Sequence, residues 1–157
     1  MTKGWESKRS QIMIVAADRG VREQIARELS SFELEVRGSY LSAYTRFCQG
    51  ARPALLILAV DESAIKAAEI ILGIVNHLGT GRPASMVVTS RWREPRINDT
   101  PIGFYFMMVY GASHCSLPLW HSTPWDGLKL QTDLALGMRE VERRRREMNR
   151  YILEGKV

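Results

Sequence analysis

The chain alternates short apolar runs with segments of helical periodicity, and this order limits its possible folds more than any other feature of the sequence. Three apolar runs have the length and aliphatic content of strands: Gln11–Val15, Ala54–Val60 and Met86–Thr89. A fourth segment, Leu34–Val36, alternates apolar and charged residues like a half-buried strand. The segments between them repeat apolar residues every three or four positions, as amphipathic helices do: Val21–Ser31, Tyr40–Phe47 and Ala64–Leu78. Strands that alternate with helices form a parallel sheet with helices on both faces. The sequence therefore predicts a doubly wound α/β fold.

The pattern is less regular after the fourth predicted strand. Arg91–Thr100 combines a proline and an Asn-Asp pair with three arginines, which is typical of a loop. Pro101–Ala112 contains no charged residue. Its composition favours a strand, whereas its place in the alternation favours a helix with Val109 on the inner face, and both interpretations stay open. Ser113–Leu117 is the candidate for the fifth strand.

The last segment has the signals of one long helix. Thr123 is suited to the N-cap and Pro124 to the first helical position, and no other proline occurs before Glu154. A helix of about 31 residues would be about 46 Å long. Because a domain of this size cannot cover such a length, we expect the second half of the helix to project.

The charge of the chain is concentrated at its two ends. The 157 residues include 22 Lys and Arg against 17 Asp and Glu, a formal net charge of +5. Residues 1–10 carry a net charge of +2, residues 120–157 another +2, and the long middle part only +1. A nearly neutral body argues against a nucleic-acid-binding domain, although nucleic-acid contact through the basic termini remains an alternative.

The apolar stretches are too short to cross a membrane. The longest, Ala54–Val60 and Pro101–Ala112, fall short of the roughly 20 residues of a membrane-spanning helix. The polar Met1–Ser10 lacks the features of a signal peptide. Cys48 and Cys115 are too few for a disulfide framework, and we expect reduced, packed thiols. These features predict a cytoplasmic protein without membrane insertion.

Five short motifs lie in a characteristic order along residues 11–120. They are Ile12–Asp18, Val21–Glu23, Pro53–Ala59, Met86–Thr89, and Gly111-Ala112 followed by Pro118. In these motifs the chain resembles the receiver domain of bacterial two-component response regulators. The resemblance implies a flavodoxin-like, five-stranded parallel sheet in the order 2-1-3-4-5, with the functional site at the carboxyl ends of the strands. It divides the chain into a polar tail (1–10), a receiver-like domain (11–121) and an extended C-terminal helix with coiled-coil potential (122–157).

The resemblance also implies which residues would perform phosphoryl transfer, and this chain lacks most of them. In receivers an aspartate ending the third strand accepts the phosphoryl group, two acids after the first strand hold Mg²⁺, and a lysine before a proline neutralises charge. The motifs place Ala59 at the acceptor, Ala16 and Ala17 at the acidic pair, and Leu117 at the lysine. A hydroxyl is kept at Thr89, or at the next residue if the register slips. Because alanine cannot attack phosphorus, these positions indicate a degenerate phosphorylation site.

Two acids near these positions leave a shifted site open. Asp18 follows the first strand and Asp61 follows the third, but the former also suits the N-cap of the first helix and the latter a solvated loop. His114, Cys115 and His121 lack the compact spacing of a metal site. No glycine-rich phosphate-binding loop precedes a helix. We expect no metal, no cofactor and no enzymatic activity.

Two apolar surfaces remain as candidate interfaces. If 101–112 is a helix, its outer face carries apolar or aromatic side chains where polar ones are usual: Phe104, Met107, Met108 and Tyr110. The terminal helix carries an imperfect heptad seam, in which Arg145 takes one apolar position: Leu134, Met138, Val141, Met148 and Ile152. The arginine run 143–146 is flanked by glutamates that can pair with it three or four residues away.

These observations lead to one functional hypothesis and two alternatives. The hypothesis is a bacterial pseudo-receiver, a phosphorylation-independent signalling module that forms homodimers and binds a partner signalling protein. One alternative is a nucleic-acid-associated regulator that uses the basic termini. The other is a module that binds a small ligand in the apolar pocket left by Ala16, Ala17, Ala59 and Leu117.

Overall fold

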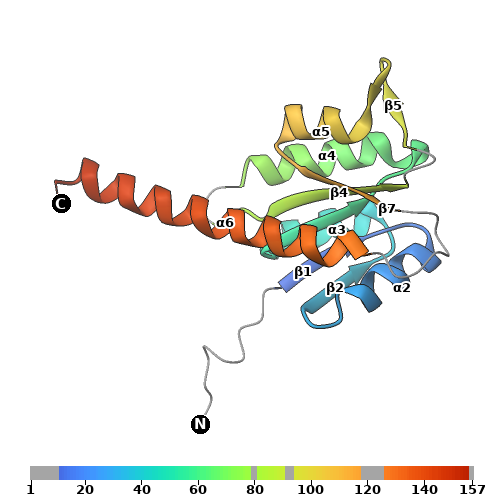
Figure 1. The fold of residues 1–157 in the computed structure, drawn as a ribbon, viewed down its shortest axis with the longest axis horizontal. Coiled ribbons are helices and arrows are strands. Elements are labelled where there is room, and N and C mark those ends of the chain that lie inside the picture. Colours follow the sequence, from blue (N-terminus) through green and yellow to red (C-terminus); the bar gives the residue numbers. More distant parts are fainter. Residues whose placement is uncertain (1–10, 79–80, 91–93, 118–125, 156–157) are drawn as a thin grey trace, which may run out of the picture.

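The computed structural model describes residues 11–78, 81–90, 94–117 and 126–155, and its centre is a five-stranded parallel sheet (Figure 1). The strands pair in the order β2-β1-β3-β4-β7. Their bounds are β1 Gln11–Val15, β2 Glu33–Arg37, β3 Leu55–Ala59, β4 Ala84–Ser90 and β7 Ser113–Leu117. Counted among these five strands, the order is 2-1-3-4-5, which confirms the predicted doubly wound sheet.

Helices cover both faces of this sheet, because the strand side chains alternate between two apolar clusters. The helices are α2 Arg19–Glu28, α3 Tyr40–Cys48, α4 Ile65–Asn76, α5 Ile102–Tyr110 and α6 Asp126–Leu153, and a short 3₁₀ turn, η1 Glu62–Ala64, precedes α4. Met13, Leu56 and Val87 face the layer of α3, α4 and α5. Ile12, Ile57 and others on the opposite face pack against α2 and the start of α6. All these strand side chains are fully buried.

Two hydroxyl or carboxylate caps define where the first helices begin. The Asp18 side chain accepts a hydrogen bond from the backbone N–H of Val21 (3.0 Å), as predicted for the N-cap of α2. Ser39 accepts from Ser42 N–H at the start of α3 in the same way (3.1 Å). The caps satisfy backbone donors that a helix leaves unpaired.

The segment predicted as a loop, Arg91–Thr100, contains a small hairpin in its described part. β5 Arg96–Ile97 pairs antiparallel with β6 Thr100–Pro101. Asn98 and Asp99 between them have φ angles of 49° and 65°. A left-handed backbone at the two central residues fits the twist of a two-residue hairpin. After glycine, Asn and Asp are the residues that adopt this conformation most readily. The loop prediction was wrong here because two-residue strands are too short to show an alternating pattern.

The uncharged segment 101–112 is mainly a helix, α5, which resolves the strand-or-helix alternative. Ile102 and Phe106 are fully buried against the sheet, and this packing outweighs the strand propensity of the aromatic residues. Val109 was predicted on the inner face, but its side chain is 53% exposed. α5 turns Val109 outward beside Met108.

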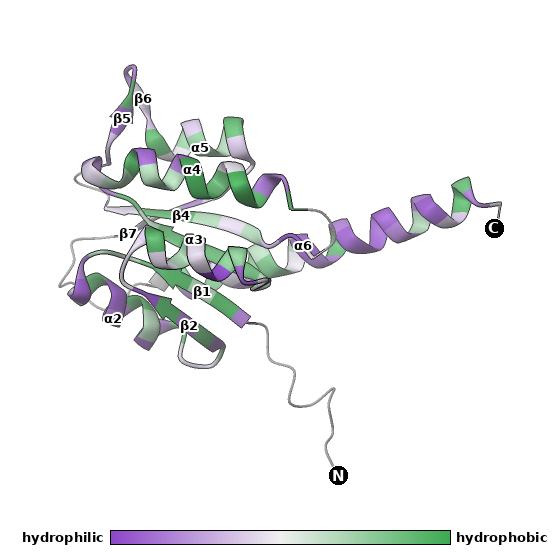
Figure 2. Cartoon of the chain, turned by 180° about the vertical axis from the view of Figure 1, so that it is seen from behind, coloured by the Kyte–Doolittle hydropathy of each residue, from purple (hydrophilic) through white to green (hydrophobic). Residues whose placement is uncertain are grey.

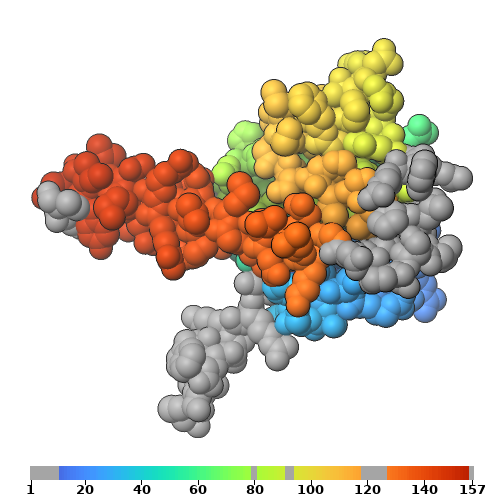
Figure 3. Space-filling view, viewed as in Figure 1, coloured from blue at the N-terminus to red at the C-terminus, as the bar shows by residue number. Residues whose placement is uncertain are grey.

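The long helix α6 packs on the domain only near its start. Leu128, Thr132 and Ala135 are buried, whereas the part beyond them stands clear of the domain, as expected (Figures 1 and 3). Figure 2 shows mostly hydrophilic residues along this projecting part. The proposed cap and first residue, Thr123 and Pro124, lie outside the described residues.

The two thiols have different environments. Both cysteines are free, and Cys115 is buried as expected. Burial raises its pKa to about 11. Cys48, predicted to be packed, is exposed at the last position of α3, on the side of the helix away from the core. In the part of the chain that the structure describes, no helix is both long and apolar enough to span a bilayer.

Candidate functional site

The carboxyl edge of the sheet brings together the five positions predicted for the degenerate phosphorylation site. Ala59 and Leu117 are the last residues of β3 and β7, and Ala16 and Ala17 follow β1 directly. Thr89 is the penultimate residue of β4 and is completely buried. Ala16 and Leu117 are each 1% exposed. The topology therefore supplies the expected location, with small or apolar side chains at four of the five positions.

A guanidinium group lies beside the two alanines at the end of β1. Arg22, on α2, donates from Nη1 to the carbonyl oxygen of Ala16 (2.8 Å) and makes a longer contact to that of Ala17 (3.5 Å). The same group covers Gly38, where a Cβ atom would lie only 2.9 Å from Arg22 Nη1. A permanent positive charge therefore stands where the resemblance implies an acidic pair. Sequence reasoning did not place Arg22 at this site, because an arginine on a predicted amphipathic helix is an ordinary surface residue.

The Tyr40 side chain bonds to the backbone of the residue at the predicted acceptor position. The Tyr40 hydroxyl donates to the carbonyl oxygen of Ala59 (2.7 Å) across 19 residues of chain. Burial raises the pKa of Tyr40 far above its usual range, and the nearby negative charge of Asp61 adds to the effect. The phenol therefore stays protonated and keeps donating at any physiological pH.

The hydroxyl predicted to survive, Thr89, is already engaged. Its Oγ1 shares a hydrogen bond of 2.7 Å with Nε2 of His114, from β7. His114 Nε2 lies 3.8 Å from Glu94 Oε1, and the same carboxylate oxygen accepts from the backbone N–H of Gly103 (2.9 Å). Burial lowers the pKa of His114, although Glu94 opposes this shift. The hydroxyl, imidazole and carboxylate thus form one chain of polar groups between β4, β7 and α5.

Gly103 leaves the space for this imidazole. A Cβ atom at Gly103 would lie 2.3 Å from His114 Nδ1, closer than any side chain permits. α5 can therefore approach β7 at this point only with glycine in this position. Sequence reasoning considered His114 only as a weak metal ligand and did not identify Glu94 or Gly103.

The two acids considered for a shifted site both act as local caps. Asp18 accepts from Val21 N–H, as described above. Asp61 accepts from both the N–H (3.0 Å) and the hydroxyl (2.7 Å) of Ser63 at the start of η1. Among the described residues, no group of three or more His, Cys, Asp or Glu side chains is arranged to hold a metal ion.

In the candidate interface on α5, three residues are exposed, whereas the fourth, Tyr110, is bonded to the neighbouring helix α4. Phe104, Met107 and Met108 are 53%, 47% and 67% exposed. Tyr110 is half-buried, and its hydroxyl donates to Glu69 Oε2 on α4 (3.1 Å). Burial, and after it Glu69, raises the pKa of Tyr110 to about 12. Tyr105 donates to the same oxygen (3.3 Å), so Glu69 joins α4 to α5.

The predicted seam of α6 is exposed along its whole length. At least half of the surface of each seam residue is open to solvent: Leu134, Met138, Val141, Met148 and Ile152. The arginines beside it form the expected ion pairs, with Arg143 bonded to Glu140 (2.5 Å) and Glu147 (2.6 Å), and Arg145 bonded to Glu142 (2.6 Å).

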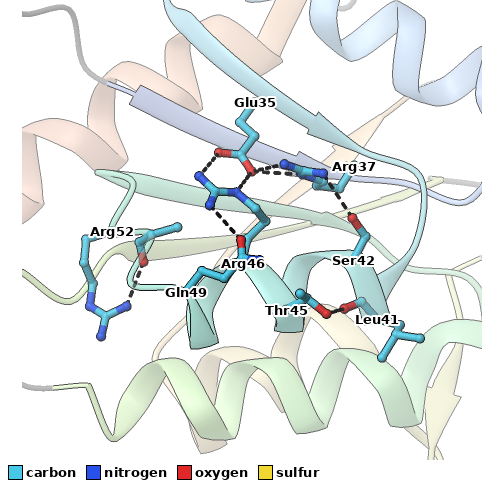
Figure 4. A network of polar contacts seen from close by, with 9 residues as sticks. Glu35, Arg37, Leu41, Ser42, Thr45, Arg46, Gln49 and Arg52 are labelled. Atoms are coloured by element: carbon cyan, nitrogen blue, oxygen red, sulfur yellow. Dashed lines mark hydrogen bonds and ion pairs between the residues drawn. The ribbon is translucent and has the colours of Figure 1, made fainter.

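A further polar network joins the edge strand β2 to α3 (Figure 4). The Glu35 carboxylate accepts from Arg46 Nε (2.7 Å) and lies 2.8 Å from Arg37 Nη2. The hydrogen bonds from Arg46 are the main reason why the pKa of Glu35 is lowered. Arg37 also donates to Ser42 Oγ (3.3 Å). This network holds α3 against the edge strand.

Known proteins resemble this chain in structure but not in sequence. No family model matches the sequence, and no curated protein does. The signal receiver domain of a protein described as a LuxO repressor from Vibrio parahaemolyticus is similar with a TM-score of 0.65 at 15% identity, over 86% of this chain and 95% of that domain. A CheY-like receiver domain from Methanospirillum hungatei gives 0.58 at 14% identity, over 86% and 99%.

A third similar structure is a fusion that contains a trimeric coiled coil of yeast Spc42. Its TM-score is 0.63 at 15% identity, and the match covers 92% of this chain and 97% of the fusion. The identities are too low to transfer residue roles. The strand order, the helices on both faces and the near-complete coverage agree, and the chain has the fold of response-regulator receiver domains.

Proposed function

We propose that this chain is a signalling module that acts through protein contacts and does not accept a phosphoryl group by the receiver mechanism. The observation that supports this most directly is the Arg22 guanidinium, 2.8 Å from the carbonyl oxygen of Ala16. A cation at this point opposes Mg²⁺ binding, and the methyl group of Ala59 offers no nucleophile. On this proposal the protein is not an enzyme and works in the cytoplasm.

Treatment with acetyl phosphate or beryllofluoride in the presence of Mg²⁺ tests this proposal. We expect no covalent phosphoryl adduct by intact mass and no Mg²⁺-dependent change in tryptophan fluorescence. A receiver with a complete acidic site serves as the positive control under the same conditions. An adduct that maps to Asp18 or Asp61 would overturn the proposal and indicate a shifted site.

We further propose that the module forms homodimers and binds a partner protein through α5 and α6. The support is the exposed apolar surface of Phe104, Met107 and Met108, together with the seam of α6. A solvent-exposed heptad seam is the usual basis for helix association. The coiled-coil fusion among the similar structures is in keeping with an oligomerising extension on a fold of this kind.

Light scattering on the full chain tests the dimer directly. We expect a mass of two chains at tens of micromolar. A strict monomer under these conditions would refute self-association while leaving the first proposal intact.

A further inference from the structure

A cavity of about 730 Å³, partly open to solvent, lies at the amino edge of the sheet, on the side opposite the candidate site. Its floor is formed by the residues that begin β4 and β7, among them Pro83, Ser85 and Ser113. α6 lines its other side, from Ala135 at the buried base of the helix to Arg150 on the projecting part. A volume of this size lies within the range of about 300–1,000 Å³ found for small-molecule sites.

Arginine dominates the lining of this cavity. Five arginines face two glutamates there: Arg82, Arg139, Arg143, Arg146 and Arg150 against Glu142 and Glu147. The ion pairs Arg143–Glu147 (2.6 Å) and Arg146–Glu142 (3.5 Å) neutralise one arginine each. Within the described parts of the chain, no ion pair involves Arg82, Arg139 or Arg150. The cavity therefore keeps an excess of about three positive charges, supplied from two separate elements.

One of these donors is buried without a partner. Arg139 Nε is inaccessible to solvent and makes no hydrogen bond in the described structure. Buried polar groups are nearly always paired, so an unpaired guanidinium nitrogen beside a cationic cavity indicates a missing acceptor. An anion bound in the cavity would offset this uncompensated positive charge without having to touch the buried nitrogen itself.

We propose that this cavity binds a small molecule with a di- or triphosphate group. The planar guanidinium matches phosphate oxygens in a two-point geometry. Arg82, just before β4, and Arg139, on α6, both line the cavity. Ser85 and Ser113 add hydroxyl groups at the floor, and Ala135 and Met138 add apolar surface for an organic part such as a base. Glu142 and Glu147, also on α6, oppose a continuous nucleic-acid strand, which would pass close to both carboxylates.

Calorimetric titration of the full chain with three probes tests the site. We expect ATP and inorganic tripolyphosphate each to bind once per chain, and adenosine not to bind. No heat of binding with either phosphate probe at 50 mM salt would overturn the proposal. A short single-stranded oligonucleotide that binds more tightly than ATP would replace it with a nucleic-acid surface.

Charge-matched variants distinguish a defined site from general attraction. Arg139→Gln and, separately, Arg82→Gln should each weaken ATP binding at least about tenfold, the loss of one charge-assisted contact. Arg144→Gln and Lys129→Gln each remove one positive charge from the same helix, but neither residue lines the cavity or belongs to the seam, and we expect less than a twofold change. Equal weakening by all four variants would overturn the site. Arg82 lies outside the helix, so its variant keeps the test valid if Arg139→Gln fails to fold.

Discussion

At the scale of single residues, the carboxyl edge is organised by groups that bond to one another. Arg22 and Tyr40 both bond to backbone carbonyls at positions where the resemblance implies acids. Thr89 bonds to His114 and not to solvent. Each of these polar groups is satisfied by a neighbour inside the chain. We therefore expect these polar groups to contribute to the stability of the fold at the carboxyl edge.

His114 should make stability depend on pH. Its folded pKa is lowered by burial, so below about pH 6.5 the unfolded chain takes up a proton more readily than the folded chain. We expect the free energy of unfolding to be largest above pH 6.5 and to fall as the pH drops toward 5, measured by urea denaturation.

Two histidine variants test whether His114 causes this dependence of the free energy of unfolding on pH, called the slope below. His114→Gln should lower stability at pH 7 by about 1–2 kcal/mol, through the loss of the Thr89 bond and of packing, and should flatten the slope between pH 6.5 and 5. His77→Gln, on the exposed end of α4, is the control and should keep the slope. A slope that persists in His114→Gln would contradict the assignment.

At the scale of the helix, Arg145 interrupts the seam of α6. It occupies the position between Val141 and Met148 where the heptad pattern requires an apolar residue, and it is held by Glu142 (2.6 Å). Arg145→Leu should complete the seam and lower the dimer dissociation constant about tenfold or more, since burying a leucine contributes about 1.5–3 kcal/mol. Analytical ultracentrifugation measures this.

Two further variants make the seam test specific. Arg144→Leu adds the same side chain one position away, off the seam, and should leave the dissociation constant within twofold. Val141→Glu should weaken the dimer, because it places a charge in the seam. If both leucine variants strengthen association alike, general hydrophobicity and not the seam is responsible.

The elements that the sequence predicted well are those whose evidence lies within one segment. The buried strand β3 and the cap at Asp18 depend on a few adjacent residues, and both were found as expected. α5 stayed ambiguous because its aromatic residues favour strands locally, and only packing against the sheet decides for a helix. Arg22 and Tyr40 could not be predicted at the site, since their partners are brought close by the tertiary fold.

At the scale of the whole molecule, the domain and the projecting part of α6 should be separable. Removal of residues 140–157 takes away no residue of the buried core, so we expect cooperative unfolding with a stability change below about 1 kcal/mol. Removal of 126–157 also takes Leu128 and Ala135 from the core, and we expect loss of cooperative unfolding. Thermal denaturation followed by circular dichroism compares them. Equal melting of both truncated chains would show that α6 does not stabilise the sheet.

The projecting helix has a mechanical consequence for any signal that reaches the domain. Leu128, Thr132 and Ala135 form a short buried base on the sheet, while the part from residue 139 to 153 extends about 20 Å beyond it. A tilt of about 10° at the base would move the tip by about 4 Å, and this displacement grows in proportion to the length of the projecting helix. Small repacking beside β4 and β7 would thus be converted into a displacement that a partner at the tip can sense.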